Sequence, residues 1–217
     1  ISDDTYSDCK ISVTDNASNT SDNLSVSSFT IDTVKPVLAQ VTAVTTPTKD
    51  PTPGYAFSSD EAGTISYGGC SQGETSADNG TNSISFGTLS EASYSCTITV
   101  TDSAGNASSP LSVNTFVVDT TAPTLSQVTA VTTPTNDTTP GYAFSSNEAG
   151  TISYGGCSAG GTSAISGTNS ISFGTLSEAS YSCTITVTDS AGNASSALSV
   201  NTFVVDTTAP NLSELTA

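Results

Sequence analysis

The chain repeats itself with a fixed period of 87 residues. Residues 36–122 and 123–209 differ at only ten of their 87 aligned positions. Self-similarity at a fixed period is the signature of a tandem array of structural units. Two groups of residues recur at this interval, one acidic and one of cysteines: Asp32, Asp119 and Asp206; Cys9, Cys96 and Cys183.

The repeat divides the chain into four parts. We expect residues 1–35 to be the C-terminal part of a preceding repeat, and 36–122 and 123–209 to be whole repeats. Residues 210–217 are then the first strand of a following repeat. A unit of this length has the size of a small single domain.

The charge balance argues against several classes of partner. The chain has 20 acidic residues, three basic residues and no histidine, which gives a formal net charge of −17 at pH 7. Such a surface repels nucleic acid and anionic membranes, because both are bound through lysine and arginine. No run of 18 apolar residues occurs, so membrane insertion is not expected. The expected partners are neighbouring repeats of the same chain, with lateral association into a fibre as a further possibility.

Short alternating segments separated by Gly, Pro, Asn and Asp predict an all-β unit without helices. Many short strands at this spacing indicate an antiparallel β-sandwich. We expect Tyr142 and Phe144, and their counterparts Tyr55 and Phe57, to pack in the core rather than to form a sugar-binding platform. In the second whole repeat the predicted strands are 125–131, 141–146, 151–154, 170–173, 181–188 and 198–205.

Three motifs recur in a fixed order within the repeat. LSEASYSC at 89–96 and 176–183, with a related ISDDTYSDC at 1–9, is the sequence form of a tyrosine corner. TDSAGN follows at 101–106 and 188–193, diverged to TDNASN at 14–19, and VVDTTAP stands at 117–123 and 204–210. On these motifs the whole chain resembles the bacterial Ig-like repeats of large cell-surface adhesins.

The resemblance implies a fold and a role. The fold is a series of tandem immunoglobulin-like antiparallel β-sandwich repeats. The role is that of a non-enzymatic stalk in an adhesin or surface filament, outside the cell and at its surface.

In an Ig-like sandwich four of the five cysteines form two pairs, and Cys9 is left over. Strands C (151–154) and F (181–188) are antiparallel neighbours, so the end of C lies beside the start of F. This predicts disulfides between Cys70 and Cys96 and between Cys157 and Cys183, with the partner of Cys9 outside the chain. Most bacterial Ig-like repeats lack cysteines, so the bridges are a departure from that family. Metal binding by the cysteines is the rival interpretation, but no CxxC motif and no histidine are present.

The recurring aspartate of VVDTTAP can be placed in the same fold. The last strand leaves the sandwich at the end opposite to the BC loop (SSNEAGT, 145–151) and the FG loop (TDSAGN, 188–193), so this residue faces those loops of the following repeat. Calcium takes six to eight oxygen ligands of the kind that these segments carry, and the resemblance to calcium-stiffened repeats points the same way. The alternative is that these residues are ordinary turn formers. The candidate ligands are Asp32, Asp60, Glu61, Asp102 and Asn106 at the first joint, Asp119, Asn147, Glu148, Asp189 and Asn193 at the second, and Asp206 at a third.

No catalytic constellation is visible in the sequence. Histidine is absent, and no paired-carboxylate cleft is recognisable. A binding module remains the alternative to a stalk. The segments 71–81 and 158–168 are rich in Gly and Ser, differ most between the repeats and are expected to be exposed loops that could contact a glycan or protein.

Overall fold

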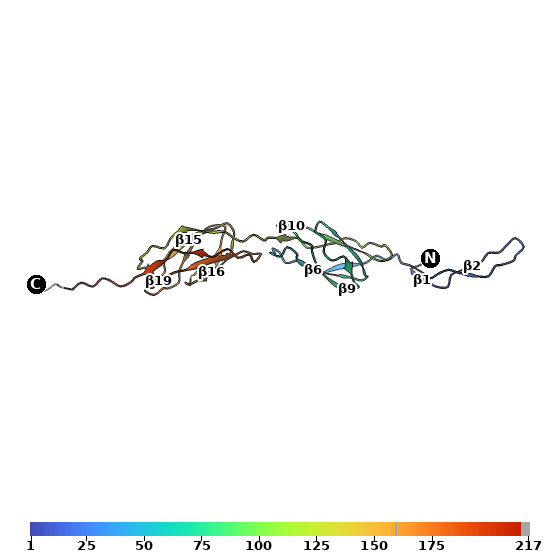
Figure 1. The fold of residues 1–217 in the computed structure, drawn as a ribbon, viewed down its shortest axis with the longest axis horizontal. Coiled ribbons are helices and arrows are strands. Elements are labelled where there is room, and N and C mark those ends of the chain that lie inside the picture. The colour runs from blue at the N-terminus through green and yellow to red at the C-terminus, as the bar shows by residue number, and fades with distance from the viewer. Residues whose placement is uncertain (159, 214–217) are drawn as a thin grey trace. The chain divides into compact units, whose positions relative to one another are not determined.

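The computed structural model describes residues 1–158 and 160–213. None of these residues is helical, so the described chain has no helix long and apolar enough to cross a membrane. All ladders between the named strands are antiparallel, and the strands are drawn as arrows in Figure 1. The chain forms two compact units, Ile1–Thr45 with Thr52–Phe116, and Thr46–Pro51 with Val117–Ala217.

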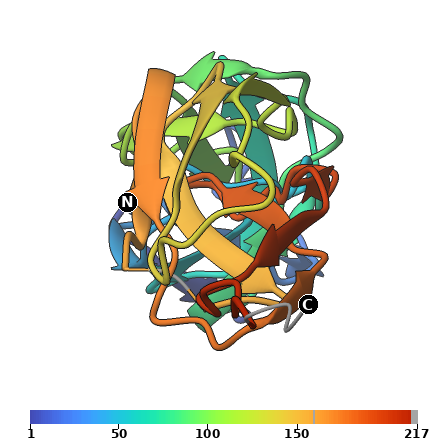
Figure 2. The ribbon, with the colours of Figure 1, turned by 90° about the vertical axis from the view of Figure 1, so that its left-hand side faces the viewer.

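The second unit contains two principal sheets and a short two-stranded ladder, which face the viewer in Figure 2. In spatial order, the strands of the first sheet are β14 (Leu125–Thr129), β15 (Gly141–Ser146) and β18 (Gly167–Ser172). Those of the second are β17 (Ser163–Ala164), β16 (Gly150–Gly155), β20 (Thr184–Thr188) and β21 (Leu198–Ser199), and the ladder is β19 (Ala179–Tyr181) with β22 (Phe203–Val205).

The first unit repeats this strand order. It also contains two shorter ladders near the N-terminus, β1 (Asp4–Tyr6) with β4 (Phe29–Ile31) and β2 (Lys10–Ile11) with β3 (Leu24–Ser25). Its sandwich consists of β5 (Leu38–Thr42), β6 (Gly54–Ser59) and β9 (Gly80–Ser85); β8 (Ser76–Ala77), β7 (Gly63–Gly68), β11 (Thr97–Thr101) and β12 (Leu111–Ser112); and β10 (Ala92–Tyr94) with β13 (Phe116–Val118). Both sandwiches therefore have the immunoglobulin-like arrangement that was predicted.

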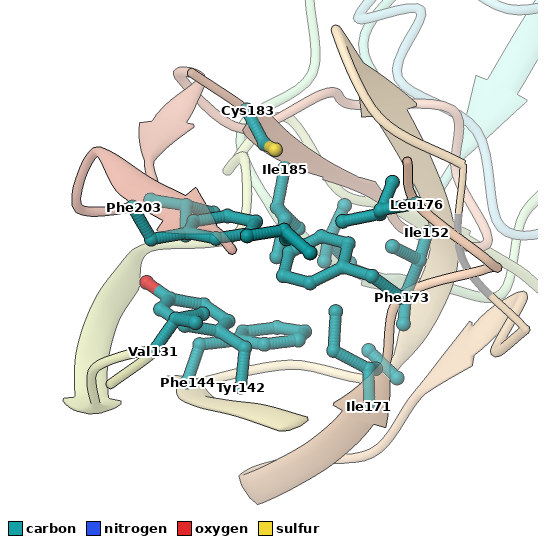
Figure 3. Packing of buried hydrophobic residues seen from close by; sticks show 14 residues of the cluster. Val131, Tyr142, Phe144, Ile152, Ile171, Phe173, Leu176, Cys183, Ile185 and Phe203 are labelled. Atoms are coloured by element: carbon teal, nitrogen blue, oxygen red, sulfur yellow. The ribbon is translucent and has the colours of Figure 1, made fainter. Parts of the chain in front are cut away.

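Aromatic side chains from the first sheet and from the ladder, together with aliphatic side chains of the second sheet, fill the core of the second unit. Figure 3 shows Tyr142 and Phe144 projecting from β15 toward Phe173 and Phe203. Tyr142 is 2% exposed and Phe144 is fully buried, as are their counterparts in β6. The prediction that these rings pack in the core is confirmed, and they offer no exposed platform for a sugar.

The predicted strands 141–146, 151–154 and 170–173 overlap β15, β16 and β18, but two longer predicted strands are each divided between two ladders. The predicted strand 181–188 is divided into β19 and β20, and the predicted strand 198–205 into β21 and β22. The division occurs beside Asn201, whose amide donates to the carbonyl of Val131 and accepts from its N–H, both at 2.9 Å. This side chain supplies hydrogen-bond partners for the backbone of Val131 where the segment 198–205 passes from one ladder to the other.

The segments predicted to be exposed loops are partly strands. Residues 71–81 contain β8, which pairs with β7, and residues 158–168 contain β17, which pairs with β16. The hydroxyl of Tyr67 donates to the carbonyl of Glu74 at 2.6 Å, and that of Tyr154 donates to Gly161 at 2.5 Å. Backbone pairing thus holds these segments to the sheet, and their Gly- and Ser-rich sequence did not predict it.

The tyrosine corner and both disulfides occur as predicted. Tyr94 donates to the carbonyl of Ser90 at 2.8 Å, and Tyr181 to Ser177 at 2.9 Å. Disulfides join Cys70 to Cys96 and Cys157 to Cys183, with Cα atoms 5.5 and 5.4 Å apart, and Cys9 is free among the described residues. Of the predicted strand 210–217, residues 210–213 are not in a strand and 214–217 lie outside the described residues.

Candidate metal centre

Three carboxylates converge beside the start of the first sandwich. Asp32 follows β4, Glu61 lies in the turn between β6 and β7, and Asp102 follows β11. One oxygen of each lies within 4.8 Å of the others. Three segments that are distant in sequence therefore bring negative charge to one point.

Glu61 is the least satisfied member of this cluster. Its Oε2 is buried and has no hydrogen-bond partner among the described residues. Burial raises the pKa of the Glu61 carboxyl, and the negative charges of Asp32, Asp102 and Asp60 raise it further. The site thus holds a carboxylate oxygen that lacks a compensating donor or positive charge.

Asp102 is held in place by its own loop. Its Oδ1 accepts from the N–H groups of Ala104 at 2.8 Å and Asn106 at 2.9 Å, and its Oδ2 accepts from the Asn106 amide at 2.9 Å. Burial alone would raise the pKa of Asp102, but the hydrogen bonds, led by those of Asn106, outweigh it and lower the pKa. The Asn106 amide also donates to the carbonyl of Asp32 at 3.1 Å, so it connects this loop to the segment that follows β4.

The second unit has the same arrangement. Asp119, Glu148 and Asp189 also have carboxylate oxygens within 4.8 Å of one another. Asn193 donates through its amide to Asp189 Oδ2 and to the carbonyl of Asp119, both at 2.9 Å. As at Asp102, hydrogen bonds outweigh burial and lower the pKa of Asp189. The grouping of three acids recurs in both units, as two repeats that differ at only ten of 87 positions would be expected to show.

The remaining predicted ligands are not among the three acids of either cluster. Asp60 Oδ1 accepts from the N–H of Val37, and Asn147 Oδ1 from that of Thr124, both at 2.7 Å, so both residues fix the chain just before β5 and β14. Asn106 and Asn193 present their amide N–H groups, rather than an oxygen, to the acids. Asp206 Oδ1 accepts from the N–H of Thr208 at 3.1 Å, and it belongs to neither cluster.

One interaction near the linker was not foreseen from the sequence. Glu178, in the turn before β19, accepts from the hydroxyls of Thr207 and Thr208 at 3.1 and 2.7 Å. These bonds lower the pKa of the Glu178 carboxyl. The sequence did contain a signal for this interaction, because the glutamate of LSEASYSC and the threonines of VVDTTAP recur together in the repeat.

The chemistry of the clusters suits a hard cation. Calcium binds carboxylate oxygens, with carbonyls and water completing six to eight ligands. The three acids of each cluster would supply the charge, and Glu61 Oε2 would gain a partner. Nothing in the clusters resembles a catalytic arrangement of nucleophile and base.

The comparisons with known proteins concern structure alone. No protein-family model matches the chain, and no curated protein matches it. Similar solved structures include the fibronectin(III)-like modules of CbhA from Clostridium thermocellum, at 12% identity and a TM-score of 0.43 over 78% of this chain and 94% of that one. The D00–D0 domain of intimin has 12% identity and a TM-score of 0.34, and covers 79% of this chain and 99% of its own. The D0–D1 domain of intimin has 11% identity and a TM-score of 0.27, and covers 76% and 97%.

Proposed function

We propose that these tandem sandwiches are non-enzymatic structural repeats of an extracellular, cell-surface stalk, and that calcium bound at the acidic clusters stiffens the connections between repeats. One observation carries the proposal. Asp32 and Asp119, which directly follow the last strand of a repeat pattern, lie within 4.8 Å of acids from two loops of the next. The two disulfides support an oxidising, extracellular setting.

The FG loop has a third copy at 14–19, which allows the loop to be compared with and without neighbouring acids. Asp15 accepts from the N–H groups of Ala17 and Asn19 and from the Asn19 amide, at 2.9–3.0 Å. This is the pattern seen at Asp102, yet Asp15 belongs to no acidic cluster among the described residues. The loop therefore has the same hydrogen bonds at Asp15 as at Asp102, and we expect the effect of a cation to fall on the linker aspartate and the glutamate of each cluster.

The expected consequence is a change of rigidity rather than of fold. Without a cation, three nearby carboxylates repel one another, and the linker after Asp119 can act as a hinge. A cation that binds only the docked arrangement stabilises that arrangement by mass action. The sandwiches themselves are held by their cores and disulfides, so they should remain folded.

Small-angle scattering with and without calcium, at fixed ionic strength, tests the proposal. We expect chelator to shorten and broaden the distribution of end-to-end distances while circular dichroism stays nearly unchanged. Asp119→Asn should reproduce this loosening in the presence of calcium. Asp15→Asn is the matched control, because it removes an acid from the same loop motif outside any cluster. Identical profiles, with no calcium bound by the purified protein, would contradict the calcium part of the proposal and leave VVDTTAP as a plain turn.

The alternative function is a glycan- or protein-binding module that uses the segments 71–81 and 158–168. In the first repeat Glu74 Oε2 accepts from the N–H of Ser85 at 2.7 Å, which holds this segment against β9. In the second repeat Gly161 replaces Glu74. Replacement of both segments by one common sequence should leave a stalk function intact, whereas it would abolish ligand binding by such a module.

A further inference from the structure

The turn that leads into β9 differs chemically from its counterpart in the second repeat. Asn79 directly precedes Gly80, the first residue of β9, whereas the second repeat has Ser166 before Gly167. Both glycines have positive φ angles, 110° at Gly80 and 111° at Gly167, which residues with a side chain rarely adopt. The backbone therefore requires glycine in both repeats, and only the residue before it differs between asparagine and serine.

The backbone of this turn is held in the same way in both repeats. In the first, the Asn82 side chain accepts from the N–H of Asp78 at 2.8 Å and donates to the carbonyls of Asp78 and Gly80 at 2.9 and 3.1 Å. In the second, the Asn169 side chain makes the three equivalent bonds at 2.8, 2.9 and 3.1 Å. The two turns thus differ in their side chains and not in these hydrogen bonds.

The side chain before the glycine connects this turn to the one between the strands β6 and β7, or β15 and β16. The Asn79 amide donates to the carbonyl of Asp60 at 2.5 Å, and the Ser166 hydroxyl donates to that of Asn147 at 2.7 Å. As donors, the amide and the hydroxyl are equivalent. Only the amide, however, contains a carbonyl carbon that a neighbouring backbone nitrogen can attack.

The surroundings of Asn79 leave room for such an attack. Asn79 is exposed, and a side-chain carbon added to Gly80 would meet no atom within 4 Å. Glycine has no Cβ that could obstruct the approach of its own nitrogen to the preceding side chain. In the whole sequence, Asn79 is the only asparagine that is followed by glycine.

We propose that Asn79 is a site of spontaneous deamidation, through which the first complete repeat gains a negative charge with time. The second repeat has an unreactive serine at this position. The modification needs neither an enzyme nor a cofactor, and water is the only reactant that it consumes. It does not depend on calcium at the acidic clusters.

The reaction has two steps. In the first, the backbone nitrogen of Gly80 loses its proton and bonds to Cγ of Asn79, which closes a cyclic imide. The bond from Cγ to Nδ2 breaks, and Nδ2 takes up the proton and leaves as ammonia. In the second, water opens the imide. Hydrolysis between the nitrogen and Cγ gives aspartate, and hydrolysis between the nitrogen and the backbone carbonyl carbon of residue 79 gives isoaspartate, whose main chain passes through Cβ.

Both products lose the contact with the turn between β6 and β7. An ionised carboxylate has no hydrogen to donate, so it would face the Asp60 carbonyl as a second acceptor. Isoaspartate also adds a methylene to the main chain directly before Gly80, which lies opposite Ser59 at the end of the ladder between β6 and β9. We therefore expect residues 60–62 to open more often after the reaction.

Incubation of the full chain over a series of pH values, followed by digestion and mass spectrometry, tests the proposal. Asn79 should convert at least about tenfold faster than Asn16, which is also exposed but precedes alanine, because alanine has a Cβ. The rate should rise with pH, since the attacking nitrogen must lose its proton. Hydroxylamine should trap the imide and, once the disulfides are reduced, release fragments that end at residue 79 and begin at residue 80. Conversion of Asn79 no faster than that of Asn16 would overturn the proposal.

Two variants separate the chemistry from its effect on the turn. Asn79→Ser copies the second repeat, so it should prevent the mass change and the hydroxylamine fragments while it keeps a donor to the Asp60 carbonyl. Asn79→Asp has one of the products from the outset. Amide hydrogen exchange in residues 60–62 should be faster in Asn79→Asp than in Asn79→Ser, and the aged parent should approach the faster rate. Equal exchange in the two variants would overturn the proposed effect on the turn.

Discussion

Asp60 and Asn147 occupy equivalent positions in the two repeats, and each binds a backbone N–H while also influencing the neighbouring acidic cluster. Both accept from the N–H that precedes the first strand, so a carboxylate and an amide are equivalent for that task. They differ in charge, and only Asp60 adds to the negative potential that raises the pKa of Glu61. The Asn147 amide instead donates to Glu148 Oε1 at 3.1 Å.

Asp60→Asn should lower the pKa of Glu61 without restoring its ordinary value. The substitution removes one like charge, but burial, which is the largest cause of the raised pKa, remains. A carboxyl whose pKa is raised on folding stabilises the fold below its unfolded pKa, and this contribution is lost as the pH rises through the folded pKa. In calcium-free buffer, this pH-dependent loss should be smaller in the variant than in the parent.

Side-chain NMR of Glu61 over a pH series provides the measurement. Asp22→Asn, which removes an exposed acid that does not contribute to the raised pKa of Glu61, is the control. A Glu61 pKa that fell to its ordinary value in Asp60→Asn would show that charge, and not burial, dominates at this residue.

The acids of both clusters could be predicted from the sequence, but the positions of the neighbouring predicted ligands Asp60 and Asn147 could not. The linker aspartate, BC glutamate and FG aspartate recur with the repeat, and the sandwich topology brings these segments to one end. The direction in which Asp60 and Asn147 point depends on one backbone N–H across the joint, 23 residues away in each case. No local pattern encodes that contact.

The bounds of the strands likewise depend partly on neighbouring residues and partly on contacts with residues distant in the sequence. The strand β15 agrees with its predicted bounds because a proline precedes it and a polar turn follows it. The division of the last strands depends on Asn201 and Val131, which are 70 residues apart. Alternation continues across the division in 181–188, so periodicity alone predicts one longer strand there. In 198–205 the buried positions change phase between Val200 and Phe203, which the prediction of a single strand did not take into account.

Asn201→Ala should therefore destabilise the second unit by about 2 kcal/mol, since two hydrogen bonds of about 1 kcal/mol each are lost. The N–H of Val131 should lose its protection from exchange first, because it donates directly to the missing side chain. Hydrogen exchange across the second unit measures both effects. Thr202→Ala is the neighbouring control and should change neither, and unchanged protection at Val131 would mean that another group replaces the amide.

At the scale of the molecule, each complete repeat combines a modest core with one disulfide. Replacement of Cys157 and Cys183 by alanine should lower the free energy of unfolding of the second unit by about 3 kcal/mol, the value for a closed loop of this size. Denaturant titration of the second unit, with and without the substitutions, measures the loss. The parent treated with reductant is the matching control, and it should lose a similar amount if the bridge acts mainly on the unfolded chain.

The position of the disulfides has a mechanical consequence for a chain that is pulled from its ends. Cys70 and Cys96 are 26 positions apart, and tension that enters the repeat passes directly through the sulfur–sulfur bond. The residues between them bear no load, even after the sandwich has opened. About 90 Å of chain per repeat is thereby withheld from extension. A filament of such repeats would yield in shorter steps under tension than its contour length implies, and it would retain compact loops from which each sandwich could close again when the tension falls.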